Sequence, residues 1–219
     1  KIALEKAKAA TVQEAIADPK KNKVFYEYMS KPMAGQKTNA GEYVKGIEDY
    51  IPNSQYERSE HQNIVVQDIK SNWMILSRNG KFHAIFATSS IPEAIQYYGL
   101  IKAAIPDMKV TVLFDPSIDN NGTGIIKEDG LKEIISDYNA RYRQTFTIPT
   151  FAKMKKDISN RLAHKHPYTT IEKTPDQQID LLIVVDQMLT GFDSKWINVL
   201  YMDKVLQYEN IIQAFSRTN

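Results

Sequence analysis

Two apolar runs near the carboxyl end of this 219-residue chain constrain its fold more than any other feature. The first is LLIVVD at 181–186, and the second is INVLYMD at 197–203. Strands that are buried on both faces of a parallel sheet give near-continuous apolar runs of this kind. Ligands of such sheets bind at the loops that follow the carboxyl ends of the strands. The Thr-Gly-Phe-Asp turn at 190–193 is therefore the first candidate functional loop.

The same α/β alternation is predicted upstream. The segments FHAIFAT (82–88) and KVTVLFD (109–115) are typical of buried strands. Between them, 91–105 is typical of a helix, with Pro92 in its first turn and a serine near its cap. A strand–helix–strand unit predicts a right-handed crossover between parallel strands.

Further helices are predicted from spacing and stop signals. Apolar residues recur near the helical period over 63–78, and Asn79-Gly80 ends that pattern. Helices are also expected over 131–142, over 151–165, and from Glu209 to the end of the chain. The predicted helix 151–165 carries many basic residues, which indicate either a solvated face or contact with a phosphate backbone: Lys153, Lys155, Lys156, Arg161 and Lys165.

We divide the chain into an N-terminal connecting and helical segment, 1–62, and an α/β domain, 63–219. Residues 1–18 predict one helix carried over from a neighbouring domain, and VFYEYM at 24–29 has the composition of a strand. Residues 116–178 are predicted to be a helical insertion in the α/β domain.

Composition limits the class of protein. The net charge of +2 neither demands nor excludes a nucleic-acid partner. The absence of cysteine excludes disulfides and fits a reducing cytoplasm, and no apolar run has the ~18 residues of a membrane span. Since the chain begins with Lys1 and stops within a helical pattern, we expect a fragment of a longer polypeptide.

Several near-motifs do not predict sites. Around the stretch 34–38, Gln36 and Lys31 stand at the two positions where a phosphate-binding loop needs glycine, and the Gly-Thr-Gly at 122–124 lacks the third glycine of a dinucleotide fingerprint. Asp186 follows a strand but has no partner phosphate loop with which to hold Mg²⁺. His164 and His166 lack acidic partners at ligand spacing, so no metal site is predicted.

Three positions remain candidates for nucleotide chemistry. Gly191 allows a close backbone approach to a ligand, and Asp193 can accept hydrogen bonds from ribose hydroxyls. Arg217 offers a fixed positive charge and a fork of donors suited to phosphate. An ordinary tight turn with an Asp cap explains Gly191 and Asp193 equally well, and the surroundings of Arg217 alone favour an ordinary surface arginine on a helix.

The combination of segments resembles a known family. VVDQMLTGFDSKWINVLYMDK at 184–204, followed by ENIIQAFSRTN at 209–219, resembles motifs V and VI of superfamily 2 helicases. More closely, it is similar to the restriction (R) subunit of type I restriction–modification enzymes, and KFHAIFATSS at 81–90 is similar to motif IV. The resemblance implies the second RecA-like (P-loop NTPase-type) motor domain, with an α/β parallel sheet flanked by helices.

The resemblance also implies roles for particular residues. Gly191 and Asp193 would face the nucleotide ribose, and Gln213 and Arg217 would face the γ-phosphate. On the DNA side, the implied contacts to the backbone are made by Thr190 and Ser89.

The implied activity is ATP-dependent translocation on double-stranded DNA within a type I site-specific deoxyribonuclease. ATP and Mg²⁺ would be bound mainly by the missing first motor domain. The modification (methyltransferase) and specificity subunits would be partners in the cytoplasm, with no membrane role.

The sequence departs from the family pattern in two ways. Val185 stands where many superfamily 2 motors have threonine, and the second arginine of motif VI is expected directly after Asn219. The phosphate loop and the nuclease carboxylates are also missing, so we expect this fragment alone to be inactive. Two alternatives stay open: a motor lobe of another superfamily 2 translocase, and a catalytically inert α/β interaction module.

Overall fold

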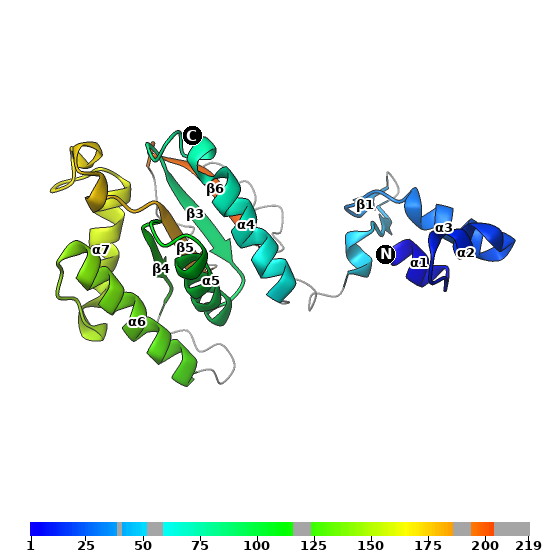
Figure 1. The fold of residues 1–219 in the computed structure, drawn as a ribbon, viewed down its shortest axis with the longest axis horizontal. Coiled ribbons are helices and arrows are strands. Elements are labelled where there is room, and N and C mark those ends of the chain that lie inside the picture. Colours follow the sequence, from blue (N-terminus) through cyan, green and yellow to red (C-terminus); the bar gives the residue numbers. More distant parts are fainter. Residues whose placement is uncertain (39–40, 52–58, 116–123, 186–193, 204–219) are drawn as a thin grey trace. The chain divides into compact units, whose positions relative to one another are not determined.

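The computed structural model describes the chain except for residues 39–40, 52–58, 116–123, 186–193 and 204–219. The chain forms two compact units, Lys1–Arg58 and Ser59–Asn219 (Figure 1). Each unit has its own cluster of buried side chains.

The first unit is mainly helical. A small hairpin and a short 3-10 turn follow three helices: α1 (Ile2–Lys6), α2 (Val12–Ala17), α3 (Pro19–Met29), β1 (Gln36–Lys37), β2 (Tyr43–Val44) and η1 (Glu48–Tyr50). The single helix predicted over 1–18 is wrong, because the backbone turns at Lys8, which has a φ of +52°. Thr11 then caps α2 by accepting a hydrogen bond from the Glu14 N–H at 3.1 Å.

The strand-like composition at 24–29 was misleading, since these residues lie in α3. The carboxylate of Asp18 accepts hydrogen bonds from the N–H groups of Lys20 and Lys21 at 2.8 and 3.2 Å. Pro19 occupies the first turn, where its missing N–H costs nothing. Phe25 is then buried against the alanines of α1 and α2. Capping and tertiary burial outweigh the weak strand preference of the aromatic residues.

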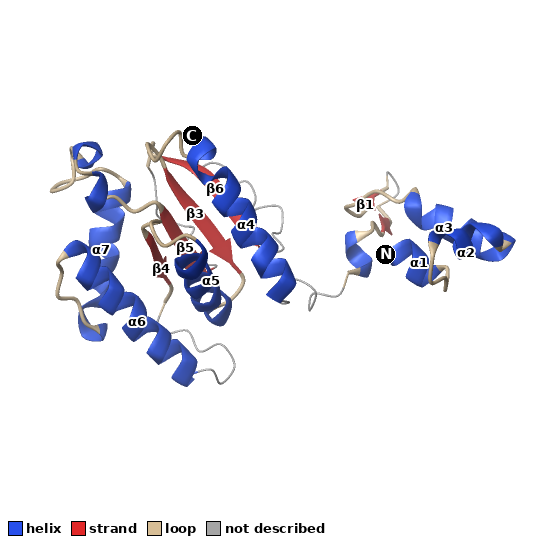
Figure 2. Cartoon of the chain, in the orientation of Figure 1, coloured by secondary structure: helices blue, strands red, loops and turns tan. Residues whose placement is uncertain are grey.

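The second unit is built on a parallel sheet of four strands in the order β4-β5-β3-β6 (Figure 2). The strands are β3 (His83–Thr88), β4 (Val110–Leu113), β5 (Leu181–Val185) and β6 (Ile197–Asp203), so all four strand predictions are confirmed. β3 and β4 do not pair directly, because β5 lies between them. Every side chain of β3 is buried, as the unbroken apolar run predicts.

Helices flank this sheet: α4 (Ser59–Leu76), α5 (Ile91–Ala104), α6 (Gly124–Tyr142) and α7 (Phe151–Leu162), with 3-10 turns η3 (Ile148–Thr150), η4 (Ile171–Lys173) and η5 (Pro175–Gln177). α4 packs against α5, and α5 packs against α6. In Figure 1, α6 and α7 lie beside the edge strand β4. The architecture confirms an α/β fold of the RecA-like type, in which the described part of the insertion is helical.

Arg161 lies in the core of this unit and not on the basic surface of α7 where the sequence placed it. Its guanidinium donates to the Asp157 carboxylate at 2.9 Å, to the Gln177 carbonyl at 2.7 Å and to the Tyr168 hydroxyl at 2.8 Å. Its Cζ atom also lies 4.2 Å from the ring centres of Tyr142 and Tyr168. Since a charged group can be buried only when it is paired, this arginine is a structural residue.

Two histidines join α7 to the start of β3. His83 Nδ1 lies 2.6 Å from the carbonyl oxygen of Ile179, and His83 Nε2 lies 2.9 Å from His164 Nε2. The Ile179 carbonyl requires a proton on Nδ1 of His83, so the His83 ring is neutral and its Nε2 accepts a hydrogen bond from the Nε2–H of His164. His164 also stacks on Trp196 at 4.1 Å. His164, which sequence analysis left without a ligand role, has a structural one.

Acidification is expected to destabilise the fold through His83. Burial lowers the pKa of His83 to about 4 and also lowers the pKa of His164. The unfolded chain takes up its proton near pH 6.5, so stability is complete above that value and is lost as the pH falls toward 4. We expect a drop from pH 7.5 to 5 to remove about 2 kcal/mol of unfolding free energy through this group.

Urea denaturation of the chain at several pH values measures this loss. His166 is exposed, so His166→Gln should keep the pH dependence, while His83→Gln should flatten it. Equal pH dependence in wild type and His83→Gln would show that the histidine pair is not the cause.

Candidate functional site at the carboxyl edge of the sheet

The carboxyl ends of the four strands lie along one edge of the sheet, because all the strands are parallel. Thr88, at the end of β3, is in register with Val185 at the end of β5 and with Asp203 at the end of β6. These three strand ends therefore lie side by side, and the chain continues from each of them in sequence. The continuation of β3 begins with Ser89, and that of β5 leads to the predicted turn at 190–193.

Ser89 and Ser90 join β3 to the amino end of α5. The Ser90 hydroxyl caps the helix by accepting from the Glu93 N–H at 3.3 Å, and the Glu93 carboxylate accepts from the Ser89 N–H at 2.7 Å. The Ser89 hydroxyl is exposed and donates to the carbonyl oxygen of Asp203 at 3.4 Å. The sequence SSIPE encodes this turn through its capping serine and the proline in the first turn.

Asp203 is the centre of a polar cluster at this edge. Its carboxylate accepts a hydrogen bond from the hydroxyl of Tyr97 on α5, and its other oxygen lies 2.7 Å from His61 Nε2 on α4. The side chain of Asp203 is only 9% exposed, so these contacts replace water. The cluster ties two helices to the last strand at the place where the chain continues toward 204–219.

The cluster of Asp203, Tyr97 and His61 was not predicted from the sequence. His61 and Asp203 are 142 positions apart, and no spacing rule connects residues of separate helices and strands. The acid that ends the run INVLYMD was the only available signal.

The local charge around Ser89 is negative. Burial raises the pKa of Glu93, the N–H of Ser89 opposes that rise, and nearby Asp203 adds to it. Burial and the hydrogen bond to Asp203 also raise the pKa of Tyr97, which keeps its hydroxyl protonated as a donor. A phosphate at this turn would have to displace the Glu93 carboxylate from the Ser89 N–H. The contact between Ser89 and the DNA backbone stays a prediction.

The other predicted site residues lie outside the described part of the chain: Thr190, Gly191, Asp193, Gln213 and Arg217. The structure shows only the ends from which they extend. Val185 ends β5 without a hydroxyl, so the first departure from the helicase pattern falls directly at the edge described above.

The described residues contain no group of three or more histidine or acidic side chains placed to hold a metal ion. Across the same residues, no helix combines the length and apolar character needed to cross a membrane.

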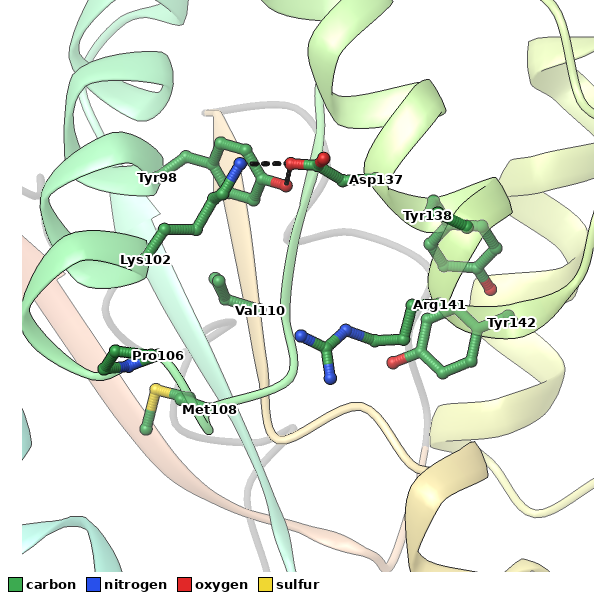
Figure 3. A pocket seen from close by; sticks show the side chains of 10 residues that line it. Tyr98, Lys102, Pro106, Met108, Val110, Asp137, Tyr138, Arg141 and Tyr142 are labelled. Atoms are coloured by element: carbon green, nitrogen blue, oxygen red, sulfur yellow. Dashed lines mark hydrogen bonds and ion pairs between the residues drawn. The ribbon is translucent and has the colours of Figure 1, made fainter.

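A pocket of about 560 Å³ lies elsewhere, between α5 and α6 (Figure 3). Lys102 pairs with Glu133 at 2.9 Å and with Asp137, which also accepts from the Tyr98 hydroxyl at 2.6 Å. The pocket floor includes Met108 and Val110, at the amino end of β4. This pocket has a mixed polar and apolar lining and lies away from the carboxyl edge of the sheet that the family resemblance implicates.

Comparison with known proteins identifies the family. The family model described as type I restriction enzyme subunit R domain 3 matches residues 80–219. A type I restriction enzyme endonuclease subunit of Staphylococcus aureus (strain MRSA252) is 34% identical over 164 residues, which is 71% of this chain and 17% of that protein. The corresponding subunit of Staphylococcus saprophyticus is 33% identical over 191 residues, which is 83% of this chain and 19% of that protein.

The chain thus spans less than a fifth of the length of these curated relatives. The match includes β3, α5, β4, the helical insertion, β5 and β6, and so covers the whole described sheet. It also contains every residue that the sequence assigned to the site, including those beyond the described part of the chain. The chain belongs to the family of type I restriction enzyme R subunits and carries their domain 3.

Proposed function

We propose that this chain is a lobe of the ATP-driven motor that moves double-stranded DNA through a type I restriction enzyme. The observation that carries the proposal is the match of the subunit R domain 3 model to 80–219, over a parallel sheet whose carboxyl edge leads into both proposed motifs. In α/β sheets this edge is where nucleotides bind.

Within this proposal, residues after β5 and β6 bind ATP. Gly191 and Asp193 take the ribose side, while Gln213 and Arg217 face the γ-phosphate. The carboxylate of Asp193 suits ribose hydroxyls, which donate hydrogen bonds. The amide of Gln213 and the guanidinium of Arg217 suit phosphate oxygens, which accept them. Bound ATP with Mg²⁺ supplies the free energy of movement in this proposal, and Mg²⁺ is held mainly by another lobe of the motor, as the family resemblance implies.

The proposed partners follow from the relatives. Those proteins are endonuclease subunits of restriction enzymes, so the full-length protein is expected to work with modification and specificity subunits. Thr190 and Ser89 are the proposed contacts to the DNA backbone, and the cytoplasm is the proposed location.

The alternatives make different predictions. An inert interaction module would bind partners without ATP turnover, and another translocase would move DNA without the modification and specificity subunits. The test is whether the full-length subunit, in complex with those subunits, displaces a third strand from duplex DNA in step with ATP hydrolysis.

A further inference from the structure

We infer that the exposed lysine face of α7, formed by Lys153, Lys155 and Lys156, contacts the phosphate backbone of duplex DNA. The inference rests on the proposed function, which requires a duplex beside this lobe. It assigns to the helical insertion a role that the motifs leave undefined.

The direction of α7 brings these lysines toward the functional edge. Phe151 opens the helix beside Phe114, directly after β4, with ring centres 6.4 Å apart. At the other end, the carbonyl of Leu162 accepts from the hydroxyl of Ser194, which lies before the amino end of β6, at 2.7 Å. α7 therefore runs opposite to the strands, and its first half, which carries the three lysines, lies toward their carboxyl ends.

The opposite face of α7 fixes the helix firmly. Met154, Ile158 and Leu162 are fully buried, and Arg161 makes the network described above. A basic face on a rigid helix loses little conformational freedom of the backbone when it binds.

The charge of the lysine face is not neutralised locally. Asp157 is the only acidic residue of α7, and its carboxylate is occupied by Arg161, Tyr138 and Tyr168. Among the described residues, no acidic side chain pairs with Lys153, Lys155 or Lys156, and all three are exposed. The lysine face therefore concentrates positive charge that Asp157, the acidic residue of α7, does not neutralise.

The chemistry of the face favours phosphate over a protein surface. Ala152 is the only apolar residue exposed beside these lysines on α7. Protein interfaces are depleted in lysine and are built around aromatic and apolar anchors. Contacts to the DNA backbone, in contrast, need only mobile positive charges that displace condensed counterions.

The test uses the full-length R subunit and a short duplex without a recognition sequence, over roughly 50 to 200 mM salt. The triple variant K153Q/K155Q/K156Q should bind at least about tenfold more weakly at the low-salt end. Each lost phosphate contact lowers the slope of log affinity against log salt by about 0.9, so the slope should fall by about 2 to 3.

The matched control is the triple variant K70Q/K81Q/K195Q, which removes the same charge from exposed lysines. Lys81 and Lys195 precede β3 and β6 and so lie at the amino edge of the sheet. This control should keep the wild-type slope, and both variants should keep the wild-type melting temperature.

Three results would overturn the inference. These are an unchanged slope in the α7 variant, an equal loss in the control, and failure of the α7 variant to join the other subunits while its DNA affinity is retained. The last result would identify the face as a site for an acidic protein. If the wild-type subunit showed no affinity for duplex DNA, the proposed function itself would fail.

Discussion

Replacing Arg217 by alanine in the full-length subunit is expected to lower duplex-stimulated ATP hydrolysis by about 10³-fold or more, the effect of losing an arginine that stabilises charge on a transferring phosphoryl group. The guanidinium is expected to act in the transition state, so turnover should fall more than ATP affinity. ATP hydrolysis and nucleotide binding, measured on the same preparation, separate the two effects.

Arg143→Ala is the control for this experiment. Arg143 is an exposed arginine of the same unit, located after α6, and its loss should leave turnover unchanged. The melting temperature of both variants should match wild type. Normal turnover in the Arg217 variant would remove that residue from the proposed catalytic set.

Replacing Arg161 by methionine is expected to cost about 3 to 5 kcal/mol of unfolding free energy, because it leaves a buried carboxylate without its counter-charge. The side chain of Asp157 is only 14% exposed, so solvent replaces the guanidinium poorly. Two tyrosine hydroxyls remain bonded to it, but they do not neutralise its charge.

Urea denaturation of the isolated chain measures this cost. Lys156→Met, in the same helix but on its exposed face, should change stability by less than about 0.5 kcal/mol. Adding Asp157→Asn to Arg161→Met should recover part of the loss, since the orphaned charge is then removed. A loss below about 1 kcal/mol for Arg161→Met would contradict the structural role of this arginine.

The sequence predicts the strands well because burial on both faces gives each one an apolar run. The order of the strands in the sheet could not be predicted from the sequence. β5 comes late in the chain, but it lies between β3 and β4. Pairing of this kind depends on contacts between distant segments, which periodicity does not encode. The strand-like composition at 24–29 was misleading for a related reason. The helix cap at Asp18 and the burial of Phe25 decide the structure of this segment.

The site was predictable only where residues follow a strand. Ser89 could be placed at the carboxyl edge from the run before it, whereas the cluster of Asp203, Tyr97 and His61 joins three separate elements. Arg161 shows the opposite failure. Its charge suggested an exposed position, but its fourth-residue spacing from Asp157 on the buried side of α7 predicts a salt bridge equally well.

Translocation by the full-length subunit, assembled with its modification and specificity partners, distinguishes a motor lobe from an inert interaction module. A third strand bound to duplex DNA at increasing distances from the recognition site reports passage of the motor. We expect displacement to need ATP and its delay to grow in proportion to distance. We also expect the isolated 219-residue chain to displace nothing. Displacement without ATP hydrolysis, or by the isolated chain, would contradict the assignment of this domain as one lobe of an ATP-driven motor.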